Sequence, residues 1–137
     1  MIAHARAAVA PARLLLDTHV WLWWQSDDRR LAKTARSAIA NAAEAYVSAA
    51  SAWEMAIKAA LGKLHAPEDI ADAVDAGGFR ELPVYFRHIA ALRALPARHR
   101  DPFDRLLLAQ AHVDGLTLVT ADPALSEYGV PHLWAGR

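Results

Sequence analysis

The sequence predicts an α/β protein with a central, mainly parallel sheet and helices on both faces. Short apolar runs alternate with longer segments of helical periodicity, and strands buried on both faces are continuous apolar runs. The clearest run, Leu14–Leu16, stops abruptly at Asp17. With 137 residues and no linker or repeat, one domain spanning residues 1–137 is expected. Residues 1–12, rich in Ala, are expected to form a flexible N-terminal extension, which raises the question of the true start codon.

The first half of the chain predicts two strands and three helices. After the strand Leu14–Leu16, a helix is expected over His19–Trp24, with Thr18 as its N-cap. A helix over Ala32–Ala43, a strand over Ala45–Val47 and a helix over Ser51–Leu61 follow. The last helix carries an apolar stripe at helical spacing, formed by Trp53, Ala56, Ile57, Ala60 and Leu61.

The second half predicts three more helices and three strands. Pro102 fits the first position of a helix, and Gly115 fits its end. The expected helices begin at Pro67, Tyr85 and Pro102, and the expected strands are Phe79–Leu82, Leu116–Thr120 and an edge strand over Val130–Trp134. Together these segments give a sheet of four to five short strands.

Composition excludes several classes of protein. The 15 Lys and Arg residues balance 15 Asp and Glu residues, which argues against a protein that holds nucleic acid by charge alone. Cysteine is absent, so there is no disulfide framework and no thiolate metal site, in keeping with a cytoplasmic protein. No apolar run approaches the roughly 20 residues of a membrane span, so no membrane association is expected.

Four acidic residues occupy equivalent positions in the predicted elements. Asp17 ends the first strand, and Asp122 follows the strand Leu116–Thr120. Glu54 and Asp104 are expected in the first turns of helices. In a parallel sheet, the strand ends and the following helix starts share one edge, where open α/β sheets bind ligands. We therefore expect these four carboxylates to converge there.

A cluster of carboxylates favours a hard divalent cation. Like charges held close together repel and raise one another's pKa, and a bound cation removes that penalty. Mg²⁺ accepts carboxylate oxygens and can also contact phosphate, and Mn²⁺ is a possible substitute. The sequence lacks cysteine and zinc-type His spacing, which makes zinc a poor choice.

Each acid also has a structural interpretation. Ser51 and Glu54 have the spacing of a capping box, and Asp101 and Asp122 each precede a proline, as N-cap residues do. Asp104 would favour the helix dipole. Asp17 is the exception, because a carboxylate that ends a buried apolar strand is expected to gain no cap by itself, and burying it unpaired is costly. The four positions together favour a metal site.

At these residues the chain resembles the PIN-domain nucleases, and among them the VapC-like toxins most closely. The matching stretches are Leu14–Trp21, Ser48–Glu54, His99–Arg105 with Leu108–Ala111, and Leu118–Asp122. They span most of the chain in the family's order. The resemblance implies a PIN-like fold and metal-dependent hydrolysis of RNA phosphodiester bonds by a toxin that a cognate antitoxin protein inhibits. It also implies a homodimer.

Carried over by position, the resemblance makes Asp17 and Asp104 the leading metal ligands. Glu54 would be a third acid that ligates directly or orients a water, and Asp122 would be the fourth. Thr120 is a candidate to hydrogen-bond either a metal-bound water or a ligand carboxylate. Asp101 lies one turn before Asp104, and the N-cap role already accounts for it.

Several other residues have more than one interpretation. Arg98, His99, Arg100 and Arg105 flank Asp104, and Arg105 is the strongest candidate to contact RNA phosphates; the alternative is a solvated loop. Lys58 lies one turn after Glu54 and is expected to pair with it. The cluster Trp21, Trp23 and Trp24 is expected to pack in the core first, to form a partner groove second and to stack on bases last. His19 and His112 are expected to be structural.

Two other functions compete with the nuclease. One is a phosphatase with an aspartyl nucleophile, but that chemistry usually needs a second Asp where this chain has His19. The other is a catalytically silent module of the same fold that binds metal or RNA. The presence of all four acids favours an enzyme. No base-reading motif identifies the RNA target.

Overall fold

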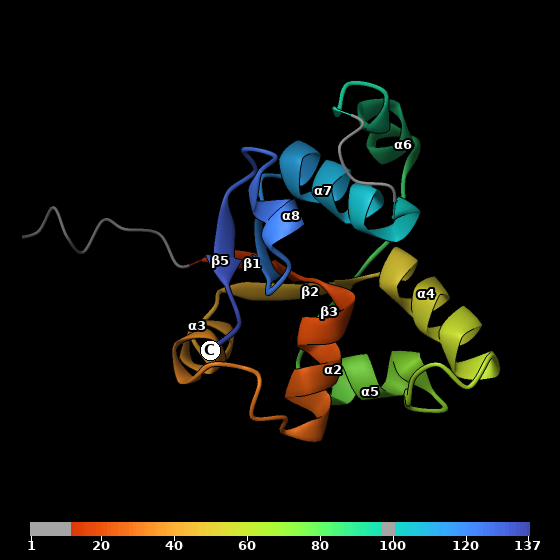
Figure 1. Ribbon diagram of the computed structural model, residues 1–137, viewed down its shortest axis with the longest axis vertical. Helices are drawn as coiled ribbons and strands as arrows, with labels where there is room; N and C mark the ends of the chain where they lie inside the picture. Colours follow the sequence, from red (N-terminus) through yellow and green to blue (C-terminus); the bar gives the residue numbers. More distant parts are fainter. Residues whose placement is uncertain (1–11, 97–100) are drawn as a thin grey trace, which may run out of the picture.

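The computed structural model describes residues 12–96 and 101–137. Within them, five strands form one parallel sheet in the order β3-β2-β1-β4-β5 (Figure 1). The strands are β1 (Arg13–Leu16), β2 (Glu44–Ser48), β3 (Arg80–Leu82), β4 (Thr117–Thr120) and β5 (His132–Trp134). The expected parallel α/β fold is confirmed. Most of the proposed extension, residues 1–11, lies outside the described residues.

The helices fall close to their expected positions. They are α2 (Thr18–Ser26), α3 (Lys33–Ala40), α4 (Ala49–Ala60), α5 (Ile70–Ala76), α6 (Phe86–Leu92), α7 (Pro102–Asp114) and α8 (Pro123–Ser126). α3 ends earlier than predicted because the side chain of Asn41 donates to the carbonyl of Ser37. α5 begins later than predicted, because the carboxylate of Asp69 accepts the Asp72 N–H and caps the helix there. None of these helices is long and apolar enough to cross a membrane.

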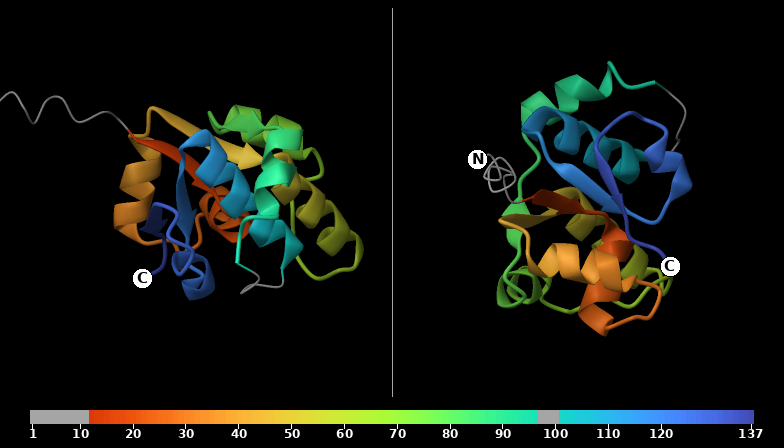
Figure 2. Two further views of the ribbon diagram at one scale, coloured as in Figure 1. Left: turned by 90° about the horizontal axis from the view of Figure 1, so that it is seen from above. Right: turned by 90° about the vertical axis from the view of Figure 1, so that its left-hand side faces the viewer.

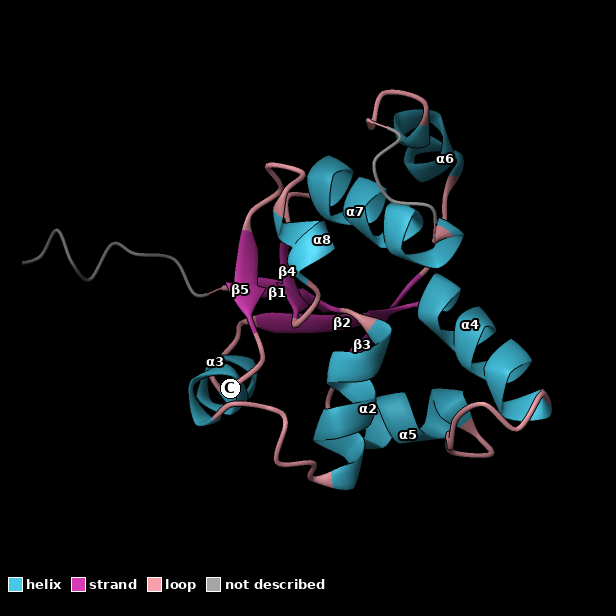
Figure 3. Ribbon diagram, in the orientation of Figure 1, coloured by secondary structure: helices cyan, strands magenta, loops and turns pink. Residues whose placement is uncertain are grey.

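Helices cover both faces of the sheet (Figures 2 and 3). On one face, Leu14 and Leu16 of β1 pack with Trp21 of α2 and with side chains of α3, α4 and α5. On the other face, Leu15 and Leu118 pack with side chains of α7 and α8. Both faces of β1 are therefore buried, which explains why its sequence is a continuous apolar run.

The order in which successive strands join the sheet changes direction at β1. From β1 the sheet grows through β2 to β3 on one side, and the chain then returns to place β4 and β5 on the other side. The gap between the carboxyl ends of β1 and β4 is the switch point of the topology, where open α/β sheets bind ligands. Asp17 follows β1 at this point, and Thr120 ends β4.

Two expected helix caps are wrong. Asp17, not Thr18, is the N-cap of α2, and its Oδ1 accepts the Val20 N–H at 2.9 Å. Ser48, not Ser51, is the N-cap of α4, and its hydroxyl accepts the Ala50 N–H. Glu54 is consequently the sixth residue of α4 and lies beyond its first turn. The expectation that Asp17 gains no cap is also wrong, because the helix starts one residue earlier than the pattern indicated.

The apolar stripe of α4 is exposed. Trp53 is 61% exposed and Leu61 is 63% exposed, and Ile57 is also open to solvent. The buried face of the helix instead carries Met55 and the polar Glu54. Periodicity shows which residues share a face, but the neighbours of the helix decide which face is covered.

Candidate functional site

Asp17 is held at the end of β1 by bonds to both of its carboxylate oxygens. Oδ1 accepts the Val20 N–H, and Oδ2 accepts the hydroxyl of Thr120 at 2.6 Å. The side chain is buried, and its backbone N–H donates to the Val119 carbonyl at 3.0 Å. Burial raises the pKa of the Asp17 carboxyl, although the hydrogen bonds from Thr120 and Val20 oppose this. The site thus contains a carboxylate whose negative charge is disfavoured unless a cation is nearby.

Asp122 lies beside Asp17. Thr120 links them, because its Oγ1 donates to Asp17 and accepts the Asp122 N–H at 3.0 Å. The charge of Asp122 is also close enough to contribute to the raised pKa of Asp17. A pocket of about 250 Å³ is lined by Asp17, Asp122, His19 and Trp23, among others. The Asp122 carboxylate caps α8 through the Ala124 N–H, so the cap interpretation is confirmed.

Glu54 is buried and fully engaged. Its Oε1 accepts the hydroxyl of Thr18 at 2.6 Å, and its Oε2 accepts from Lys58 Nζ at 2.5 Å. Thr18 follows Asp17 in sequence and also lies 2.9 Å from the hydroxyl of Ser51. Glu54 is therefore tied to the start of α2, next to Asp17. The expected pairing with Lys58 is confirmed.

Lys58 connects Glu54 to the start of α7. The hydrogen bond from Lys58 to Glu54 raises the pKa of the lysine, and the charges of Asp101 and Asp104 raise it further. Asp101 is the N-cap of α7, as expected, and accepts the backbone N–H groups of Phe103 and Asp104. One ammonium group thus faces three carboxylates from two helices.

The four predicted carboxylates and Asp101 lie along one edge in two groups. Asp17 and Asp122 share the pocket at the switch point, whereas Glu54, Asp101 and Asp104 are grouped by their interaction with Lys58. Across residues 12–96 and 101–137, no three His, Cys, Asp or Glu side chains are arranged to hold a metal ion together. The structure therefore brings the predicted residues to one edge but does not join them into one ligand set.

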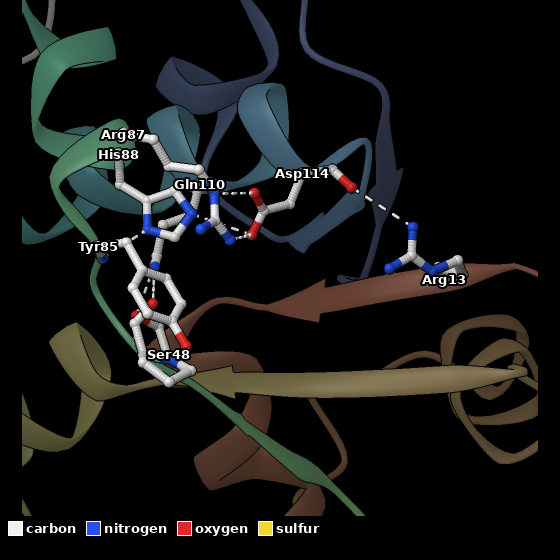
Figure 4. A network of polar contacts seen from close by, with 8 residues as sticks. Arg13, Ser48, Tyr85, Arg87, His88, Gln110 and Asp114 are labelled. Carbon is white, nitrogen blue, oxygen red and sulfur yellow. Dashed lines mark hydrogen bonds and ion pairs between the residues drawn. The ribbon is translucent and has the colours of Figure 1, made fainter.

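A buried polar network fixes α7 (Figure 4). Gln110 accepts the hydroxyl of Ser48 at 2.6 Å and donates to the Pro83 carbonyl at 3.1 Å, which ties α7 to the end of β2. His88 Nδ1 accepts the Tyr85 N–H, so Nε2 carries a proton that it donates to Asp114 at 2.9 Å. These bonds hold the helix that carries Asp104.

The side chain of Arg105 is hydrogen-bonded within the protein. Its guanidinium donates to the carbonyls of Leu92 and Leu95 at 3.3 and 3.4 Å, near the end of α6. Contact with RNA phosphates stays a prediction for Arg105. The other candidates in this loop, Arg98, His99 and Arg100, lie outside the described residues.

Sequence reasoning missed three contributors to the site. His19 was expected to be structural, but it is exposed and lines the pocket with Asp17. Thr18 was interpreted as a cap, but its hydroxyl binds Glu54. Trp23 also lines the pocket, whereas Trp21 is fully buried in the core, as expected. The position of His19 two residues after Asp17, close to the end of β1, was the one available indication.

Comparisons with known proteins show the family of the chain. The PIN domain family model matches residues 14–131. Ribonuclease VapC22 of Mycobacterium tuberculosis is 34% identical over 126 residues, which cover 86% of this chain and 93% of that protein.

Solved structures show the same fold. VapBC2 of Rickettsia felis, bound to a DNA fragment from its promoter, superposes with a TM-score of 0.66 at 13% identity and covers 88% of this chain and 96% of that one. DNA-bound VapBC of Salmonella typhimurium gives a TM-score of 0.66 at 19% identity over 90% of this chain and 97% of that one. The resemblance drawn from the sequence motifs is confirmed, and the chain belongs to the PIN domain family.

Proposed function

We propose that this protein is a Mg²⁺-dependent endoribonuclease that acts in the cytoplasm as the toxin of a toxin–antitoxin pair. The observation that carries the proposal is the pair Asp17 and Asp122, linked through Thr120 at the switch point of the sheet. The similarity to ribonuclease VapC22 supports RNA as the substrate.

The donor set fits Mg²⁺. All of the candidate ligands are carboxylate oxygens, and Mg²⁺ is commonly held by one or two carboxylates while it keeps several waters. Two ligands in one pocket, Asp17 and Asp122, meet that requirement. A cation there would also offset the burial that raises the pKa of Asp17. Mn²⁺ should substitute, because it accepts the same oxygen ligands.

Each residue then has a defined task. Bound Mg²⁺ supplies charge stabilisation for a phosphodiester and acidifies a water. Asp17 and Asp122 hold the ion, and Thr120 fixes the orientation of the Asp17 carboxylate. Asp104 is the further ligand that the family resemblance implies. Glu54 is the third acid, and because both of its oxygens already accept hydrogen bonds, from Thr18 and Lys58, we assign it to orienting a water rather than to direct ligation of the ion.

The proposed partners are an antitoxin protein, supported by the structural neighbours, and a second copy of this chain, supported by exposed apolar surface. The structural neighbours from Rickettsia felis and Salmonella typhimurium are VapBC complexes, which supports an antitoxin partner. Exposed apolar side chains on α4 and α6 support a homodimer, because monomeric proteins rarely leave such surface uncovered. These side chains are Trp53, Ile57, Leu61, Phe86 and Ile89. Light scattering should give twice the protomer mass, and a single protomer mass would refute the dimer.

RNA cleavage tests the proposed activity. Total RNA is incubated with wild-type protein in Mg²⁺ or in EDTA, and new ends are mapped by sequencing. Asp17→Asn is the site variant, and Asp72→Asn, on the exposed face of α5, is the matched control. We expect cleavage by the wild type and the control only, and only with Mg²⁺. Metal binding without any cleavage would instead favour a silent metal-binding module.

A further inference from the structure

A second pocket adjoins the carboxylate pocket. It has a volume of about 420 Å³ and shares Trp23 and Ala121 with the pocket that contains Asp17 and Asp122. The function proposed above gives it no role. Its remaining lining is aromatic and basic and includes Trp134, Arg29, Arg30 and Arg137.

The end of β5 places Trp134 at the site. Trp134 pairs in register with Thr120, the residue that bonds Asp17. The neighbouring Ala135 N–H donates to the Thr120 carbonyl at 2.8 Å, so the backbone here is firmly held. Gly136 lies so close that an added Cβ would approach Trp134 Nε1 to 3.2 Å. The backbone that carries the indole is thus held by the sheet, and 43% of the residue is exposed.

Arg30 is positioned in the same pocket. Its guanidinium lies 5.1 Å from the centre of the Trp23 ring. Asp28 holds it by two contacts, from Arg30 Nε at 3.1 Å and from Arg30 Nη2 at 2.7 Å. The side chain of Arg30 is nevertheless 68% exposed. A cation on an aromatic face, anchored from one side and open on the other, is suited to bind a phosphate.

We propose that this pocket binds a nucleotide of single-stranded RNA next to the scissile bond, with a base stacked on Trp134 and a phosphate at Arg29 and Arg30. The inference rests on the function proposed above and names the binding site for the flanking RNA. Aromatic rings and arginines are the features that bind single strands without reading sequence.

Electrostatics favours RNA in this pocket over a protein helix. The carboxylate edge repels an approaching phosphate chain. The formal net charge of the protein is zero, so the protein as a whole does not attract RNA. Arginines beside the carboxylates supply a local attraction where the chain must pass. An apolar helix would desolvate Arg29 and the ion pair of Arg30 with Asp28 without offering either arginine a new acceptor, which is costly.

The test measures RNA binding separately from cleavage. Fluorescence anisotropy of a labelled, short single-stranded RNA of mixed sequence is followed in EDTA at low ionic strength. The variants are Trp134→Leu, Trp134→Phe and Arg30→Ala. Arg80→Ala is the matched control, because Arg80 is 62% exposed and paired with Glu44, much as Arg30 is paired with Asp28. Circular dichroism confirms folding of each variant.

We expect Trp134→Leu to weaken RNA binding on the order of tenfold, while Trp134→Phe retains most of it. Arg30→Ala should weaken binding and lower the dependence on salt concentration by about one phosphate contact, and Arg80→Ala should do neither. Wild-type affinity in Trp134→Leu and Arg30→Ala, or no measurable binding by the wild type, would overturn the inference.

Two further outcomes separate this inference from the function on which it rests. If these variants bind RNA normally but lose affinity for the antitoxin, the pocket is a protein-docking surface and the inference is wrong. If the wild-type protein binds RNA through this pocket but never cleaves it with Mg²⁺, the proposed nuclease activity fails while the pocket assignment holds.

Discussion

Removal of Lys58 should destabilise the fold by leaving Glu54 buried without its cation. Glu54 has a side chain that is 3% exposed, and Lys58 is 33% exposed. In Lys58→Met, the Glu54 carboxylate keeps only the hydrogen bond from Thr18. The methionine preserves the apolar part of the lysine side chain, so the change isolates the loss of charge.

The size of the effect follows from burial. Truncating one partner of a fully buried pair costs about 3–5 kcal/mol. Because Lys58 is partly exposed and Thr18 still donates, we expect a loss of about 2–3 kcal/mol in the free energy of unfolding. For a domain of this length that corresponds to a melting temperature lower by roughly 10 °C.

A double-mutant cycle provides the assay. Urea and thermal unfolding are measured for the wild type, Lys58→Met, Glu54→Gln and the double variant at neutral pH without metal. Glu54→Gln should cost about 1 kcal/mol, and the double variant should cost less than the sum of the two single changes. Lys63→Met, on an exposed residue after α4, should change stability by less than about 0.5 kcal/mol. A loss below about 0.5 kcal/mol for Lys58→Met would show that this ion pair does not neutralise Glu54.

Three other changes have defined outcomes. Asp17→Asn should raise the melting temperature without metal, since it removes a buried charge and keeps a capping oxygen; a lower melting temperature would contradict this. Partial burial alone would raise the pKa of Asp114, but hydrogen bonds from Arg87 and His88 hold it below its ordinary value of 3.8. This stabilisation is therefore present above pH 3.8 and is lost as the pH falls through the folded-state pKa, so Asp114→Asn should flatten acid unfolding curves in that range. Gln110→Met should cost about 2 kcal/mol in urea unfolding, because the buried hydroxyl of Ser48 and the partly buried carbonyl of Pro83 lose their partner, and a neutral effect would refute the role of this network.

The sequence was sufficient to predict the sheet and the edge of the sheet at which the acidic residues gather. The apolar run Leu14–Leu16 predicted a strand buried on both faces, and the alternation with helices predicted parallel pairing. That topology alone put Asp17 and Asp122 together, although 105 positions separate them in the numbering. The cap at Asp101 was predictable because Pro102 marks the helix start.

Most side-chain contacts between distant segments were not predictable, and the bond from Thr120 to Asp17 is an exception because the parallel topology brings the ends of β1 and β4 together. The bond from Thr18 to Glu54 depends on how α2 and α4 pack, and local periodicity contains no information about that packing. The same reason explains why the Trp53 stripe was placed correctly on one face but is exposed. The neighbours of Lys58 on α7 and the position of Trp134 beside Thr120 likewise depend on tertiary structure.

The most direct test of the central claim is the binding of a divalent cation by the sheet-edge carboxylates. Electron paramagnetic resonance of free Mn²⁺ is followed during titration of the wild type, Asp17→Asn and the control Asp72→Asn. We expect the wild type and the control to bind Mn²⁺, Mg²⁺ to displace it, and Asp17→Asn to lose most of the affinity. Equal Mn²⁺ binding by Asp17→Asn and the wild type would contradict the assignment of the site.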